Sequence, residues 1–78
     1  MRKTPPITAS KIKATPRELI LFVSGKKVRI PWGKCSSKLA AATADQRLNA
    51  QLSPGGYGIH WPMLDEDLSI SGLIRAAS

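Results

Sequence analysis

The strongest constraint on the fold is a pair of strand-forming segments on either side of a short glycine turn. The segments "ELILFV" (residues 18–23) and "KVRIPW" (residues 27–32) flank the turn Ser24-Gly25-Lys26. Apolar and β-branched residues on both sides of a tight turn are typical of a β-hairpin. We therefore expect two antiparallel strands here.

Side chains alternate between the two faces of a strand, so this hairpin would have one apolar and one charged face. The apolar face is expected to contain Leu19, Leu21, Val23, Val28 and Ile30. Lys27 and Arg29 would point away from it, and Lys26 would add charge at the turn. The hairpin thus predicts a concentration of positive charge at its tip and outer face.

After the hairpin, the segment "SSKLAAATADQRL" (residues 36–48) predicts a helix. Ser36 or Ser37 could cap its N-terminus, and the alanine run has the highest intrinsic helix propensity. The segment is short and weakly amphipathic, so it would need the sheet to stabilise it.

The remaining segments complete a small α+β fold. Residues 7–14 suit an irregular edge strand that Pro16 ends, and residues 49–62 suggest a second hairpin or a strand reached through a glycine turn. Residues 68–77 predict a terminal helix. The expected order is β-β-β-α-β-β-α, with a small antiparallel sheet and one or two short helices packed on one face.

A chain of 78 residues has room for one domain. We expect residues 7–78 to form it and residues 1–6 to be a flexible basic arm. A domain this small buries only ~60% of its unfolded surface, so a protein partner or homo-oligomer formation would help to stabilise it.

The net charge of +7 is unevenly distributed. Residues 1–38 carry ten Lys or Arg and one acid, whereas residues 39–78 carry two Arg and four acids. A positive face of this kind could attract nucleic acid or an acidic protein, or it could be only a solvated surface. The candidate nucleic-acid-binding residues are Lys11, Lys13, Lys26, Lys27, Arg29 and Lys34.

The single cysteine and the absence of long apolar runs indicate the compartment. Cys35 cannot form an internal disulfide and is compatible with a reducing environment. No apolar run approaches the ~20 residues that a membrane span needs, and the N-terminus lacks the apolar core of a signal peptide. We expect a cytoplasmic protein that needs neither a membrane nor a cofactor. Cys35 has no histidine near it in sequence to act as a base, so it is a poor candidate nucleophile.

The densest polar cluster is "GIHWPMLDED" (residues 58–67), in which the only histidine precedes three acids. His60 with Asp65, Glu66 and Asp67 could suggest a metal or acid/base site. A metal site needs three or four converging ligands, and Pro62 separates the histidine from the acids. We favour a structural role, in which the acids lie at the start of the last helix and Asp67 or Ser69 caps it.

Trp32 and Trp61 allow two interpretations. In basic surroundings they could stack on single-stranded nucleic acid. In a domain with four aromatic residues they are more often the core itself. Trp61 alternates with the apolar Ile59, which favours burial, whereas Trp32 at a strand end could be partly exposed.

Three blocks of the sequence resemble the bacterial domain-of-unknown-function family 2442. They are "LILFVSGKKVRIP", "KLAAATADQR" and, most specifically, "GIHWPMLDEDLSISGLI". The resemblance spans about residues 12–76. Two departures are Ser24, where the family usually has Asp, and "WGKCSS", which replaces a more apolar stretch.

The resemblance implies an α+β fold and no established catalytic activity. Some family members resemble the N-terminal domain of proteins that continue into a DNA-binding helix-turn-helix, and others are encoded beside a second small protein in suspected toxin–antitoxin pairs.

Our leading hypothesis is therefore a non-enzymatic protein-binding or regulatory module, such as the antitoxin-like member of a two-protein system with a small cognate partner. The candidate partner-binding residues are Trp32, His60, Trp61, Asp65, Glu66 and Asp67. Nucleic-acid binding through the basic residues is the alternative. An enzyme is a third hypothesis, and it requires His60, Asp65 and Glu66 to converge in a pocket.

Overall fold

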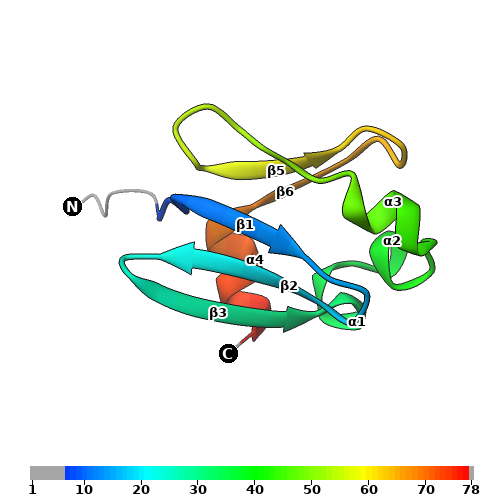
Figure 1. Ribbon diagram of the computed structural model, residues 1–78, viewed down its shortest axis with the longest axis horizontal. Helices are drawn as coiled ribbons and strands as arrows, with labels where there is room; N and C mark the ends of the chain where they lie inside the picture. Colours follow the sequence, from blue (N-terminus) through cyan, green and yellow to red (C-terminus); the bar gives the residue numbers. More distant parts are fainter. Residues whose placement is uncertain (1–6, 78) are drawn as a thin grey trace, which may run out of the picture.

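The predicted hairpin and the strand before it form one antiparallel sheet in the computed structural model (Figure 1). The structure describes residues 7–77, so the predicted arm over residues 1–6 lies outside the described residues. The sheet has the order β1-β2-β3, and its strands are β1 (Lys11–Ala14), β2 (Glu18–Val23) and β3 (Lys26–Pro31).

The turn between β2 and β3 contains two residues, Ser24 and Gly25, and Lys26 is already the first residue of β3. Both turn residues have positive φ, 52° and 76°. This is the type I′ pattern, whose twist matches that of the flanking strands. The hairpin is confirmed, and the pairing of Leu19 with Ile30, both fully buried, confirms its apolar face.

A second three-stranded antiparallel sheet follows later in the chain. Its order is β4-β5-β6, and its strands are β4 (Gln51–Leu52), β5 (Gly58–Trp61) and β6 (Glu66–Ser69). The hairpin of β4 and β5, joined through a turn with Gly55 and Gly56 at positive φ, confirms the prediction for this region.

Strand β6 was not predicted. Glu66 and Asp67 were expected to lie in a turn, and Leu68 and Ser69 were expected to begin the last helix. All four residues instead pair with β5, from Glu66 with Trp61 to Ser69 with Gly58. Glu66 and Asp67 therefore belong to a strand and Asp65 to the turn before it. None of the three lies in the first turn of α4, so the expected interaction with the helix dipole is wrong. Pairing with β5 overrides the low strand propensity of acidic residues.

Four short helices complete the fold of the described residues. They are α1 (Trp32–Cys35), α2 (Ser37–Ala40), α3 (Ala44–Leu48) and α4 (Ile70–Ala77). Of the helices in residues 7–77, none is long and apolar enough to cross a membrane.

The prediction of one continuous helix over residues 36–48 is wrong, because a second helix start lies inside it. The Thr43 side chain accepts a hydrogen bond from the Gln46 amide, and the Gln46 side chain accepts one from the Thr43 amide. This capping box begins α3 and overrides the propensity of the alanine run. Ser36 caps α2 by accepting from the Leu39 amide at 3.1 Å, as one of the two predicted alternatives.

The last helix begins at Ile70, directly after β6. Of the two predicted capping residues, Ser69 acts: its Oγ accepts a hydrogen bond from the Gly72 amide at 3.0 Å. Asp67 does not, since its side chain pairs with His60.

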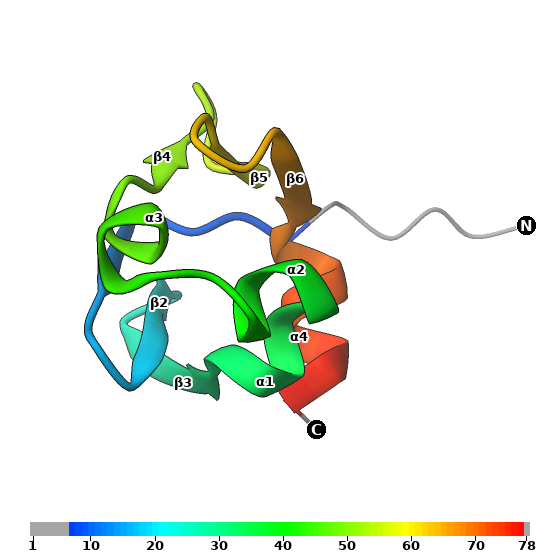
Figure 2. The ribbon, with the colours of Figure 1, turned by 90° about the vertical axis from the view of Figure 1, so that its right-hand side faces the viewer.

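The core lies between the two sheets and the helices (Figures 1 and 2). Helix α4 packs against β3, β6 and α1. The Ala9 amide donates to the Gly56 carbonyl at 2.8 Å, which ties the segment before β1 to the second sheet. The α+β class is confirmed, with the order β-β-β-α-α-α-β-β-β-α. The buried core consists of Ala9, Leu19, Leu21, Ile30, Trp32, Leu39, Ile59, Trp61, Ile70 and Leu73.

Candidate functional site

The outer side of the first sheet gathers cationic side chains in two cross-strand rows. In one row Phe22 on β2 pairs with Lys11 on β1 and Lys27 on β3. In the next row Ile20 pairs with Lys13 and Arg29. Because residues directly opposite on neighbouring strands point to the same side of a sheet, each row places an apolar side chain between two cations. We call this surface, with Arg17 beside it, the basic face.

Alternation along β2 creates this arrangement. Leu19 and Leu21 point inward and are fully buried, so Ile20 and Phe22 must point to the other side. Ile20 is nevertheless only 8% exposed, which the aliphatic stems of its two long neighbours explain.

Phe22 interacts with both cations of its row. The Lys11 ammonium lies 5.4 Å from the centre of the Phe22 ring, and the Lys27 ammonium lies 5.8 Å from it. Both distances fall within the range of cation–π attraction, about 6 Å. The ring therefore holds two positive charges close to an apolar surface.

One carboxylate lies at the end of the basic face. Arg29 Nη1 and Glu18 Oε2 form an ion pair at 2.7 Å, and the side chains are 60% and 26% exposed. An exposed pair of this kind contributes only about 0–1 kcal/mol to stability. Glu18 orients Arg29 and neutralises part of the local charge.

The rows border a hollow of about 540 Å³. Its lining residues are Lys11, Lys13, Thr15, Pro16, Arg17, Glu18, Ile20, Phe22, Lys27 and Arg29. Five of them are cationic and one is acidic. The hollow is a positively charged depression with an apolar floor.

The structure brings four of the six predicted basic residues together: Lys11, Lys13, Lys27 and Arg29. Lys26 pairs with Val23, on the opposite side of the sheet, and Lys34 lies in α1. Neither lines the hollow.

Sequence reasoning missed Arg17, Ile20 and Phe22 as members of this surface. Alternation within "ELILFV" could have placed Ile20 and Phe22, because it assigns them to the side away from the core. Arg17 lies in the loop before β2, where alternation gives no signal.

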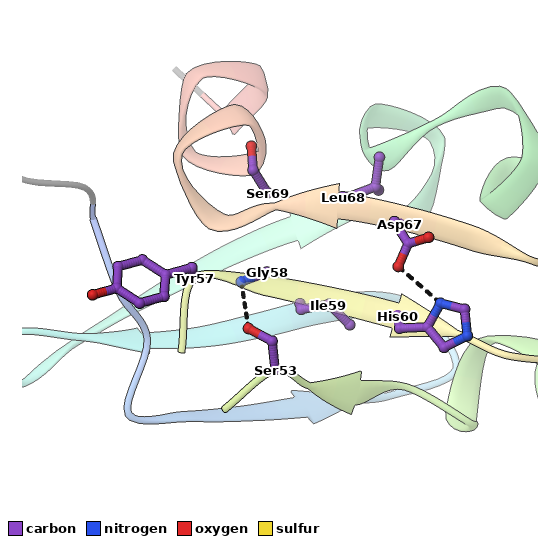
Figure 3. Close-up of a pocket in the computed structure, with 8 residues that line it drawn as sticks. All are labelled: Ser53, Tyr57, Gly58, Ile59, His60, Asp67, Leu68 and Ser69. Carbon is purple, nitrogen blue, oxygen red and sulfur yellow. Dashed lines mark hydrogen bonds and ion pairs between the residues drawn. The ribbon is translucent and has the colours of Figure 1, made fainter. Parts of the chain in front are cut away.

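A second, smaller hollow of about 360 Å³ lies over the second sheet (Figure 3). His60 Nδ1 and Asp67 Oδ1 lie 2.8 Å apart at its edge, with side chains 41% and 74% exposed. Ser53 Oγ accepts a hydrogen bond from the Gly58 amide at 3.0 Å, and both residues line the hollow (Figure 3). The histidine is thus paired with one acid on an open surface.

The other two acids do not join this pair. Asp65 lies in the turn between β5 and β6 with φ of 51°, and Glu66 alternates with Asp67 and so points to the other side of the strand. The convergence of His60, Asp65 and Glu66 that the enzyme hypothesis required is not formed. Within residues 7–77, no group of three His, Cys, Asp or Glu side chains is arranged to hold a metal ion.

Both tryptophans are core residues, so their assignment to a partner-binding surface is wrong. Trp32 is 2% exposed and Trp61 is 0% exposed, and their rings pack edge to face at 6.3 Å. Trp32 Nε1 donates to the Thr15 carbonyl at 2.8 Å, and Trp61 Nε1 donates to the Arg47 carbonyl at 3.1 Å. Burial is possible because each indole N–H has a partner.

Cys35 lies half-buried beside this core. Burial raises the pKa of its thiol to about 11, although the positive charge of Arg47 acts in the opposite direction. The thiolate, which is the nucleophile, is therefore scarce at neutral pH.

Comparisons with known proteins agree with the fold. The model of the family described as "Protein of unknown function (DUF2442)" matches residues 9–78. A crystal structure of a protein of unknown function from Rhodospirillum rubrum ATCC 11170 is similar, with 28% sequence identity and a TM-score of 0.78. The match covers 91% of this chain and 88% of that chain. No curated protein matches the sequence. The resemblance of the "GIHWPMLDEDLSI" block is thereby confirmed, and the chain belongs to the DUF2442 family of proteins of unknown function.

Proposed function

We propose that this protein is a non-enzymatic binding module whose basic face holds the phosphate backbone of a nucleic acid. The observation that carries the proposal is the pair of cross-strand rows, Lys11–Phe22–Lys27 and Lys13–Ile20–Arg29. The rows supply four cations on one side of one sheet, and most affinity for nucleic acids comes from such contacts with phosphates. A cytoplasmic location, as expected from the sequence, fits this role.

The composition of the basic face favours nucleic acid over an acidic protein. Three of its five cations are lysines, a residue that is depleted in protein–protein interfaces. A lysine ammonium serves well as a point charge for phosphate. The depression along β2, between the cations of β1 and those of β3, also offers a path for a chain of phosphates, with only one carboxylate beside it.

The experiment is a fluorescence anisotropy titration of the protein with labelled DNA and RNA oligonucleotides from 20 to 300 mM salt. With about four phosphate contacts, log K should fall with log salt at a slope of about −3 for single strands, because each contact contributes about 0.7. Failure to bind either nucleic acid at the lowest salt would contradict the proposal.

A second candidate function is binding to a protein partner, as the antitoxin-like member of a two-protein bacterial system. The observation that favours it is an exposed apolar pair away from the basic face: Leu48 on α3 is 48% exposed, and Met63 in the β5–β6 turn is 55% exposed. The two belong to adjoining surfaces, since the Asn49 side chain donates to Met63 Sδ at 3.2 Å. Exposed apolar residues that lie together often mark protein interfaces.

Co-purification from the native host tests this candidate. A stoichiometric partner should be retained by a Lys27→Gln variant and lost from a Met63→Glu variant. Recovery of the chain without any stoichiometric protein would count against a two-protein system.

A further inference from the structure

Phe22 lies on the outer side of β2, away from the core. The inner side of β2 already supplies Leu19 and Leu21, both fully buried, while Phe22 is half-buried between two lysines. An aromatic ring held between Lys11 and Lys27 is hydrophobic surface left within reach of a ligand.

The hollow around Phe22 is open on its outer side. All of its lining residues fall within the range 11–29, so the sheet and its β1–β2 loop form the hollow by themselves. The strand spacing of about 4.8 Å places the Lys11 and Lys27 backbones about 10 Å apart across Phe22. The hollow therefore has cations along both borders, on β1 and on β3, with Phe22 and Ile20 between them.

We propose that the basic face binds single-stranded nucleic acid, with one base stacked on Phe22 and the neighbouring phosphates bound by the flanking cations. This inference rests on the proposed function and adds the class of nucleic acid. Stacking on an aromatic ring between cations is the way in which proteins bind single strands without reading their sequence.

The apolar floor of the hollow, formed by Ile20 and Phe22, should distinguish a single strand from a duplex. The bases of a duplex are stacked on each other and paired, so a duplex can offer only its phosphates to the lysines. A single strand can turn a base toward Phe22 and Ile20 while its backbone contacts the rows. The two classes should therefore differ in their dependence on Phe22. Both should weaken with salt through their phosphate contacts, by about 0.9 per contact for a duplex and about 0.7 for a single strand.

The test compares Phe22→Leu with the unsubstituted protein, using a 12-nucleotide single strand and the matching duplex over the same series of salt concentrations. Removing one base–aromatic contact should weaken single-strand binding about 5- to 140-fold, since such a contact contributes about 1–3 kcal/mol and 1.4 kcal/mol is tenfold. The duplex affinity and the salt slope of single-strand binding should stay within about twofold, because every cation remains.

Tyr57→Leu is the matched control. Tyr57 is an exposed aromatic residue beside the second sheet, 52% exposed, and it lies outside the basic face. Its replacement should leave single-strand binding unchanged. An equal loss of single-strand affinity in both variants would overturn the proposal, because it would show that the effect is not specific to Phe22.

Phe22→Trp keeps the test decisive if Phe22→Leu does not fold. The new indole should retain the affinity, and its fluorescence should be quenched by the single strand and not by the duplex. Unquenched emission at saturation would overturn the stacking. A further comparison uses a polyglutamate peptide with the same charge as the oligonucleotide. If the peptide binds as tightly as the single strand and loses as much affinity in Phe22→Leu, the proposal of a nucleic acid is overturned in favour of an acidic protein.

Failure of this inference is distinguishable from failure of the proposed function. If no oligonucleotide binds at low salt, the proposed function fails. If oligonucleotides bind with a steep salt slope but Phe22→Leu binds normally, the phosphate contacts stand and only the stacking is wrong.

Discussion

Arg47 is the side chain that joins the helical segments to the core. Its Nε donates to the Leu39 carbonyl at 2.9 Å and its Nη2 donates to the Ala40 carbonyl at 2.8 Å. These carbonyls lie in the last turn of α2, and the Leu39 carbonyl also accepts a hydrogen bond from the Ala42 amide at 3.2 Å. The guanidinium also lies 5.6 Å from the centre of the Trp32 ring. The Arg47 side chain thus links the end of α2 to Trp32 in the core.

We predict that Arg47→Ala lowers the free energy of unfolding by about 1–3 kcal/mol, because two charged hydrogen bonds and a cation–π contact are lost. Urea denaturation monitored by tryptophan fluorescence measures this. Arg47→Lys should restore part of the loss, since an ammonium can reach one carbonyl but not both in the same geometry. A change below 0.5 kcal/mol in Arg47→Ala would contradict this role.

The reactivity of Cys35 depends on its raised pKa. At pH 8 the thiolate fraction should be about 100-fold lower in the folded protein than in the unfolded chain, because the pKa rises from 9.0 to about 11. We predict that iodoacetamide alkylates the folded protein correspondingly slowly, with a rate that climbs up to about pH 11. The same reaction in urea is the control, and equal rates in the two states would contradict the raised pKa.

The same shift makes a small contribution to stability. Since the folded pKa lies above the unfolded value, the contribution is complete below pH 9 and is lost as the pH rises toward about 11.

At the scale of secondary-structure elements, those that depend on neighbouring residues could be predicted, and those that depend on pairing with another segment could not. The β2–β3 hairpin depends on alternation and on a two-residue turn, both of which lie within 14 consecutive residues. Strand β6 exists because it pairs with β5, and its acidic residues give no strand signal of their own. The break between α2 and α3 had a local signal, the spacing of Thr43 and Gln46, but the alanine run outweighed it in the prediction.

For the candidate site as well, local features could be predicted from the sequence, whereas contacts between separate segments could not. The clustering of Lys11, Lys13, Lys27 and Arg29 was predicted from charge, whereas their cross-strand rows required the register of β1 on β2. The alternation of apolar residues in β1 is too irregular to predict how β1 aligns with β2. The exposure of Trp32 was mispredicted because its burial depends on Trp61, which is distant in the chain.

The contact between Ala9 and Gly56 is the element-scale feature most open to test. Gly56 has φ of 77°, and a Cβ there would collide with the Ala9 carbonyl oxygen. We predict that Gly56→Ala costs more than about 2 kcal/mol, from backbone strain and separation of the two segments. Gly33→Ala is the control: it has open space and an ordinary helical position, so it should be neutral or slightly stabilising. Equal melting temperatures for the two variants would contradict this account of how the sheets are joined.

At the scale of the whole molecule, the basic face and the exposed apolar residues Leu48 and Met63 belong to different surfaces. The outer side of the first sheet gathers Lys11, Lys13, Lys27 and Arg29, while the β5–β6 turn carries Asp65 beside the exposed Met63. Such a division can serve a nucleic acid on one surface and a protein on another. The net charge of +7 could by itself attract nucleic acid weakly. A test of the basic face must therefore compare variants that have the same net charge.

The most direct measurement of the central claim compares two double variants with the same net charge. Lys11→Gln with Lys27→Gln removes two cations from the basic face, and Lys26→Gln with Lys34→Gln removes two that do not line it. Salt titrations of oligonucleotide binding should show a slope lower by about 1.4 for the first pair, at about 0.7 per phosphate contact, and little change for the second. Equal losses of affinity and slope in both pairs would contradict the claim that the basic face is the binding site.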